Sequence, residues 1–241
     1  MKVDNFYSYT PAEPSGTLSF TREASSGFAK EMAGDFNPIH NPDARRFCVP
    51  GDLLFAVVLD LFKARAKMDF EFEQMVGDQV TLEVPVHEHG LKMVDAADKC
   101  YLDVSFSGDS VESTAANQSL IAAYVKFSGQ TFPFLLVDLM KKHDVMINPQ
   151  RPLVIYRRMS IELQDLQCDS FDLAFTGSTL KVDGKKGEVD LHFDIVSEQA
   201  VVGTGCKSML LGGLREYQQD VIDELVAEYN SIKSAYQTVH S

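Results

Sequence analysis

Two patterns of hydrophobic residues alternate along the chain, and the first of them predicts helices. Between Thr21 and Gly34 apolar residues recur every three or four positions, which predicts a helix capped by Thr21 and ended at Gly34. A second helix is predicted over 52–67, because residues 53–62 are apolar on nearly every face, with Asp60 as the exception. A helix of this composition has to be covered by protein on all sides.

The second pattern is a strict alternation of apolar and polar residues, which predicts strands. In the first half it covers 80–88, 100–108 and 119–129. After a short amphipathic helix over 134–143, four more strands are predicted, over 157–166, 171–182, 187–196 and 200–211. Asp183-Gly184 predicts a hairpin turn between the second and third of these. An apolar stripe over 214–237 predicts a final helix that docks on the sheet.

A helix followed by a run of antiparallel strands occurs twice, which indicates an internal duplication. The predicted fold class is α+β, with an antiparallel sheet wrapped around a buried helix in each half. We expect an N-terminal half over 1–130, a degenerate second half over 131–213 and a C-terminal helix over 214–241 packed on the fold.

The composition of the chain excludes several classes of binding partner. Of 241 residues, 45% are hydrophobic and 24% are charged, as in ordinary globular proteins. A net charge of −13 argues against nucleic acid and anionic membrane surfaces as partners. The longest apolar run is too short for membrane insertion, and the N-terminus lacks the features of a signal peptide. Widely spaced cysteines predict free thiols and a cytoplasmic location, at Cys48, Cys100, Cys168 and Cys206.

The segment 33–43, AGDFNPIHNPD, contains the most informative chemistry. Asp35 and His40 flank Asn37-Pro38, a dipeptide that favours a turn and cannot continue a helix. Such a turn can place a carboxylate and an imidazole on one side of a loop, where the two groups can bind water or transfer a proton. Spacing alone favours a simpler interpretation, in which Asp35 caps backbone amides and His40 lies on the surface.

The motif GDFNPIH resembles the signature of the MaoC-like, (R)-specific enoyl-CoA hydratases, the hydratase-2 group of the hot-dog fold. The resemblance covers about residues 18–88 and includes FAKEMAGDFNPIH, the Val49-Pro50-Gly51 step and VGDQVTLEVPV. It implies a double hot-dog and the reversible hydration of a 2-enoyl thioester of coenzyme A or acyl carrier protein, with no cofactor. The chain is also similar to a bacterial family of this length that has no assigned role.

The same resemblance implies roles for four residues. Asp35 and His40 match the acid–base pair that activates the water, and Asn37 matches the residue that shapes the loop and contacts that water. Gly51 matches the glycine whose backbone N–H polarises the thioester carbonyl. The N-terminus of a helix suits this role, because its N–H groups and dipole stabilise developing negative charge.

Around this motif the chain has features of its own. Only ten residues separate His40 from Gly51, which is fewer than in the family, and a carboxylate, Asp52, follows the glycine. Within that short stretch Arg45 and Arg46 are candidates to bind the phosphates of coenzyme A or the acidic surface of a carrier protein. Arg157-Arg158 and Lys185-Lys186 are further candidates, and solvated surface charge is an equally good interpretation of all these pairs.

Other residues and other functions remain open. Cys48 is a candidate reactive thiol, and His87 with His89 is too small a set for a metal site. His143 and Asp144 lack the spacing of the motif, so a single active site per chain is expected, in a chain that forms a homodimer. Thioester hydrolysis is one alternative function, and an acyl-thioester-binding protein without catalysis is another.

Overall fold

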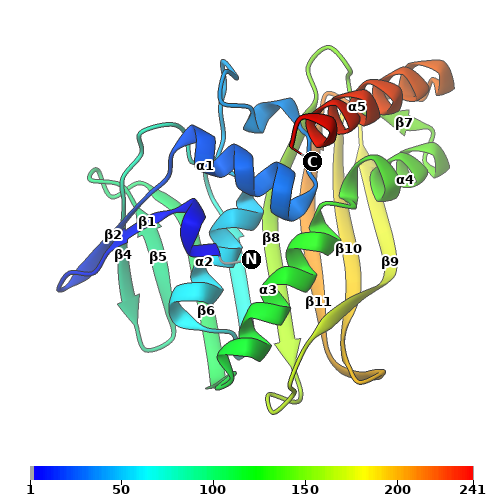
Figure 1. The fold of residues 1–241 in the computed structure, drawn as a ribbon. Coiled ribbons are helices and arrows are strands. Elements are labelled where there is room, and N and C mark those ends of the chain that lie inside the picture. The colour runs from blue at the N-terminus through cyan, green and yellow to red at the C-terminus, as the bar shows by residue number, and fades with distance from the viewer. Residues whose placement is uncertain (1–2, 241) are drawn as a thin grey trace.

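The computed structural model describes residues 3–240, and its centre is one antiparallel sheet with the helices on one face (Figure 1). The strands are β1 Ser8–Thr10, β2 Ser15–Ser19, β3 Arg65–Phe72, β4 Leu82–His87, β5 Gly90–Val94, β6 Cys100–Ser110, β7 Val145–Met146, β8 Leu153–Leu163, β9 Asp172–Asp183, β10 Lys186–Ser197, β11 Ala200–Gly212 and β12 Arg215–Glu216. The helical elements are η1 Val3–Phe6, α1 Arg22–Gly27, η2 Phe28–Ala33, η3 Pro38–His40, α2 Gly51–Phe62, α3 Thr114–Ser128, η4 Thr131–Leu135, α4 Leu136–Lys142 and α5 Gln219–His240.

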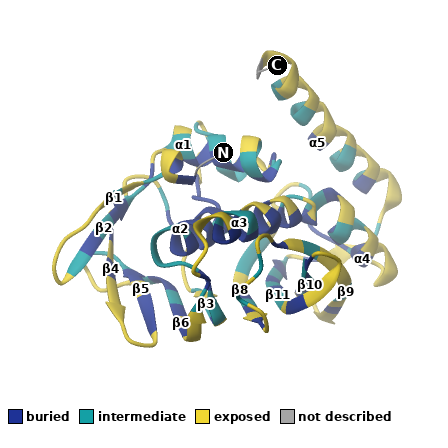
Figure 2. Ribbon diagram, turned by 60° about the horizontal axis from the view of Figure 1, so that its bottom comes forward, coloured by how far each residue is buried: buried dark blue, intermediate teal, exposed yellow. Residues whose placement is uncertain are grey.

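Ten strands follow one another across the sheet in the order β1-β2-β4-β5-β6-β3-β8-β11-β10-β9. The strands up to β6 belong to the first half of the chain, and β8 to β11 belong to the second. The two sets meet where β3 pairs with β8, with Met68 opposite Ile161. Figure 2 shows the sheet curving around α2 and α3, which are the most deeply buried helices. The predicted α+β class, with a sheet around a buried helix in each half, is therefore confirmed.

Helix α2 is buried along most of its length, as its composition predicts. Every residue from Asp52 to Leu59 is buried. The helix ends at Phe62, because Lys63 adopts a positive φ of 62° that a helix cannot continue through. The predicted extension to residue 67 is therefore wrong, and Arg65–Phe72 forms strand β3 instead.

The strand predicted over 119–129 is also wrong, since Thr114–Ser128 forms helix α3. Ser113 caps this helix by accepting a hydrogen bond from Ala116 N at 3.2 Å. Asn117 joins it to α2, because its Nδ2 donates to Leu59 O at 2.8 Å and its Oδ1 accepts from Ala64 N at 2.8 Å. A helix that packs against α2, η2 and β9 is apolar on several faces, and a run of apolar residues can also be interpreted as a buried strand.

The buried helix of the second half is thus α3, and the predicted helix over 134–143 is the shorter α4. The helix-then-strands order repeats from Thr114, which favours a boundary earlier than residue 130. The division into 1–130 and 131–213 stays a prediction, because one continuous sheet joins the two halves. The other predicted strands and the Asp183-Gly184 hairpin are present as β4, β6 and β8 to β11.

Helix α5 begins at Gln219, five residues later than predicted. Ile222 and Tyr229 are the buried residues of its apolar stripe. Tyr229 and Tyr236 contact the helical layer, with Tyr229 packing edge-on against Phe36 and Phe132, and Tyr236 against Phe36. The helix therefore docks on the helical side of the molecule and leans away from the sheet (Figure 2), which corrects the docking predicted from the stripe.

No single helix within residues 3–240 has the length and hydropathy needed to cross a membrane. One bent pair of helical segments, Thr114–Ser128 with Thr131–Lys142, meets the test by length and composition alone.

Candidate active site

The loop that carries Asp35 begins where a helix is forced to end. Thr21 caps α1 by accepting a hydrogen bond from Ala24 N at 3.1 Å, and η2 continues the same helix to Ala33. Gly34 then adopts a left-handed φ of 67°, a conformation that glycine reaches without steric cost. Asp35 N still donates to Ala29 O at 2.8 Å, so the first residue after the helix is fixed by the helix itself.

A short turn brings Asp35 and His40 together. Asn37 caps the turn η3, because its Oδ1 accepts from Ile39 N at 3.2 Å, and Pro38 opens it. Asp35 Oδ2 lies 3.7 Å from His40 Nε2. The side chain of His40 is 12% exposed and that of Asp35 is 30% exposed, so the pair lies at the edge of the solvent. The simpler interpretation from spacing is right in one part and wrong in the other: Asp35 does accept from a backbone amide, that of Asn37, but the side chain of His40 is largely buried.

In each residue of the pair, one polar side-chain atom is hydrogen-bonded to the backbone of the loop, and the other polar atom faces the partner residue. His40 Nδ1 lies 2.7 Å from Cys48 O, and a carbonyl only accepts, so Nδ1 carries a proton. Asp35 Oδ1 accepts from Asn37 N at 2.9 Å. The gap of 3.7 Å between Nε2 and Oδ2 is too long for a good direct hydrogen bond, and one water molecule contacting both atoms would join them.

The side chain of Asn37 stabilises the turn of the loop. Its side-chain oxygen is used by the cap on η3, and the residue is exposed. Its amide nitrogen and the second lone pair of its oxygen are left to contact a ligand. The predicted role in shaping the loop therefore agrees with this geometry, and the predicted contact with water stays a prediction.

Gly51 is the first residue of α2, two residues after the Cys48-Val49 step whose carbonyl orients His40. Among the described residues, none accepts a hydrogen bond from its N–H, which is one of the unpaired groups of a helix N-terminus. A Cβ at this position would lie 2.5 Å from Tyr156 Cδ1. A glycine is required here because the ring of Tyr156 lies directly against the backbone.

Replacing Gly51 by Ala should therefore destabilise the protein by about 1–3 kcal/mol, as overpacking does in a well-packed interior. The ring of Tyr156 has little room to move, because it stacks on Phe72 with centroids 4.2 Å apart. Urea unfolding monitored by circular dichroism measures the loss. Gly77→Ala is the matched control, since a Cβ there meets nothing within 4 Å, and an equal loss in both variants would contradict the steric explanation.

A buried polar cluster, made of Asp52, Tyr124, Ser128, Tyr156 and Lys207, lies next to Gly51. Asp52 Oδ1 accepts from the Tyr124 hydroxyl at 2.9 Å and lies 3.3 Å from Lys207 Nζ, and Asp52 Oδ2 accepts from Ser128 at 2.5 Å. Lys207 also contacts Ser128 Oγ and lies 4.4 Å from the centre of the Tyr156 ring, and the two tyrosine hydroxyls contact each other. Burial raises the pKa of both tyrosines, so both stay protonated.

This cluster shows how the negative charge of Asp52, which follows Gly51 in the sequence, is compensated. The charge of Asp52 is matched by Lys207 from β11 and by two hydroxyl donors from α3, so its carboxylate is fully engaged. No pattern in the sequence indicated the cluster, because its members are up to 155 positions apart. It places residues of the second half, from β8 and β11, directly against the N-terminus of α2.

Helix α5 covers the loop that carries Asp35 from outside. The Tyr229 hydroxyl donates to Gly34 O at 3.1 Å and accepts from Phe36 N at 3.2 Å, so it joins the residues on either side of Asp35. Burial, with a smaller contribution from the charge of Asp35, raises the pKa of Tyr229 to about 12. The hydroxyl therefore stays protonated at neutral pH and fixes the loop. The contact between Tyr229 and this loop could not be predicted from the sequence, because the residues are 193 or more positions apart.

Among the described residues, no hydrogen bond or ion pair joins the side chains of the remaining sequence candidates to Asp35 or His40, although the backbone carbonyl of Cys48 contacts His40 Nδ1. Arg45 and Arg46 are exposed and make no ion pair within the described part of the chain, so their binding role stays a prediction. Burial raises the pKa of the Cys48 thiol to about 12, which makes it unreactive at neutral pH. His143 and Asp144 are exposed in the turn after α4. Residues 3–240 contain no group of three or more metal-binding side chains.

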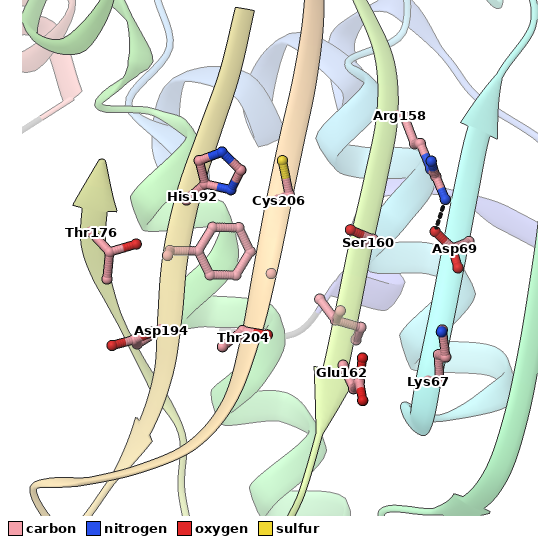
Figure 3. Close-up of a pocket in the computed structure, with 13 residues that line it drawn as sticks. Lys67, Asp69, Arg158, Ser160, Glu162, Thr176, His192, Asp194, Thr204 and Cys206 are labelled. Carbon is pink, nitrogen blue, oxygen red and sulfur yellow. Dashed lines mark hydrogen bonds and ion pairs between the residues drawn. The ribbon is translucent and has the colours of Figure 1, made fainter. Parts of the chain in front are cut away.

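A shallow pocket of about 400 Å³ lies on the opposite face of the sheet (Figure 3). Its labelled side chains come from five neighbouring strands and include His192, Cys206 and the ion pair between Arg158 and Asp69, whose Nη2 and Oδ1 are 2.5 Å apart. Arg158 is thereby committed to an acidic partner. Neither Asp35 nor His40 lines this pocket, so it is separate from the candidate site.

The chain belongs to the family described as protein of unknown function DUF3581, which matches residues 1–220. Curated proteins give no match. Among solved structures, a MaoC-like dehydratase is 10% identical with a TM-score of 0.41, covering 86% of this chain and 98% of its own. An acyl-ACP thioesterase from Bacteroides thetaiotaomicron is 11% identical with a TM-score of 0.38, covering 87% and 100%. An acyl-CoA thioesterase II from Mycobacterium marinum is 8% identical with a TM-score of 0.40, covering 70% and 90%. Likeness at this level carries no argument about the reaction.

Proposed function

We propose that this protein hydrates and dehydrates acyl thioesters, adding water across the double bond of a 2-enoyl thioester of coenzyme A or acyl carrier protein. The observation that carries the proposal is the pairing of Asp35 Oδ2 with His40 Nε2 at 3.7 Å, beside the N-terminus of a buried helix. The motif in the sequence supports the same function.

The reaction uses the two side-chain atoms of the pair that face each other, His40 Nε2 and Asp35 Oδ2. A water molecule between His40 Nε2 and Asp35 Oδ2 attacks the β-carbon, and one of the two groups takes its proton. The other group enters the step protonated and donates that proton to the α-carbon, so the product gains one hydroxyl and one hydrogen. The proton taken from water then passes from the first group to the second, which restores the pair. The Gly51 N–H donates to the thioester oxygen and stabilises the enolate that forms between these steps.

A substrate panel tests the proposal and separates it from the two other functions. The intact protein is incubated with 2-enoyl-CoA and saturated acyl-CoA substrates of several chain lengths. The proposal expects loss of enoyl absorbance without release of free thiol. Thiol release would instead identify a hydrolase, and saturable binding with neither change would identify an acyl-thioester-binding protein. The cytoplasmic location and the homodimer stay predictions.

A further inference from the structure

A second pocket, of about 600 Å³, lies between η2, the end of α3 and α5. We call it the lysine pocket, because its wall includes Lys30, Lys126 and Lys233, one from each of these elements. Gly34 and Phe36 form another part of the wall. The pocket therefore shares its wall with the loop that carries Asp35, and no run of basic residues in the sequence pointed to it.

The charge of the lysine pocket opposes that of the whole protein. Its lining carries three lysines, whereas the chain as a whole has a net charge of −13. Within the described residues, none of the three makes an ion pair within 4 Å. Glu31 is the one acidic residue among the described residues that line the pocket, and its Oε1 accepts from the Tyr236 hydroxyl at 3.1 Å.

Partial burial makes the charge of Lys30 costly without a ligand. Burial lowers the pKa of Lys30, and the nearby charge of Asp43 only partly offsets the effect. An anion in the pocket would replace the lost hydration of the ammonium group and would reduce the repulsion among the lysines.

Size and aromatic surface point to more than a simple ion. A pocket of about 600 Å³ is within the range of small-molecule sites. Tyr236 and Phe36 contribute rings to its wall, with their centroids 5.6 Å apart. Lys30 Nζ lies 5.3 Å from the centre of the Tyr236 ring, which places a cation beside the aromatic surface.

We propose that the lysine pocket binds a nucleotide that carries more than one phosphate, with Lys126 and Lys233 contacting the phosphates and the aromatic wall contacting the base. Naming the nucleotide end of coenzyme A as the occupant rests on the proposed function. This assigns phosphate binding to residues other than Arg45 and Arg46, which do not line the pocket.

Direct binding tests the proposal without any turnover. Isothermal titration of the full chain with adenosine 3′,5′-bisphosphate is compared with titrations of AMP, inorganic phosphate and pantetheine. The pocket variant is Lys126→Gln with Lys233→Gln. The control is Lys185→Gln with Lys186→Gln, which removes the same charge from an exposed hairpin outside the pocket.

The bisphosphate should bind best, and the pocket variant should lower its affinity about tenfold or more, since each lost contact to a charged group has a cost of that order. The control should stay within about twofold, because its lysines make only a screened, long-range contribution. Three results would each overturn the proposal. They are a failure of the unaltered protein to bind the bisphosphate, an equal loss of affinity for it in the pocket and control variants, and binding of inorganic phosphate as tight as that of the bisphosphate. Asp35→Asn should leave this affinity unchanged, so failure of the hydratase proposal is seen separately, in the substrate panel.

Discussion

We expect Asp35→Asn and His40→Ala each to lower turnover of a 2-enoyl thioester by about 10²–10⁴-fold, which is the contribution of a positioned acid or base. Asp35→Asn keeps an oxygen that accepts from Asn37 N, so it removes the charge and the proton transfer while preserving the turn. The initial rate of absorbance loss at the enoyl chromophore measures the effect. Unfolding free energies should change by no more than about 1–2 kcal/mol.

Two control variants show whether the effect belongs to the pair. Asp43→Asn removes an exposed carboxylate from the same loop, and His143→Ala removes an exposed imidazole from the second half. Both should stay within about threefold of the unaltered protein, because a group that transfers no proton contributes none of this catalysis. Full activity in either Asp35→Asn or His40→Ala would remove the pair from the mechanism. A loss with His143→Ala as large as with His40→Ala would show that both halves supply proton-transfer groups.

The features that sequence could predict are those set by neighbours along the chain. Thr21 and Gly34 bound the first helix through contacts within a few residues, and Asn37-Pro38 turns the chain so that Asp35 and His40 meet. The apolar run after Gly51 identifies α2 because a helix buried on all sides needs no polar face.

What the sequence could not predict depends on partners that are distant along the chain. Residues 119–129 contain types that are common in strands, such as Tyr124, Val125 and Phe127, whereas the four alanines of α3 favour a helix, so local composition left both structures open. Asn117 connects this helix to α2. Tyr229 contacts the loop that carries Asp35 from α5, and the three lysines of the lysine pocket come from separate elements. Periodicity reports which face of an element is buried but not what buries it.

The pair formed by Asp52 and Lys207 should be strongly coupled in folding, and this is the largest stability effect that the structure predicts. The two side chains are 13% and 6% exposed, with Oδ1 and Nζ 3.3 Å apart. Lys207→Met leaves a buried carboxylate without its counter-charge, and Asp52→Asn leaves a buried ammonium group in the same position. Each should lower the free energy of unfolding by about 3–5 kcal/mol.

The double variant, Asp52→Asn with Lys207→Met, should lose much less than the sum of the two single losses, because it leaves no unpaired charge. The amide oxygen of Asn can accept from one of the two hydroxyls, those of Tyr124 and Ser128, and its amide nitrogen can donate to the other. Urea unfolding of the unaltered protein, the two single variants and the double variant completes this double-mutant cycle. The exposed pair Lys92–Asp103, at 2.9 Å, is the matched control, and Lys92→Met should lower the free energy of unfolding far less than either buried substitution, because solvent screens an exposed pair. Additive losses in the buried pair would mean that Asp52 and Lys207 are each satisfied without the other. The second half would then contribute no electrostatic support to the N-terminus of α2.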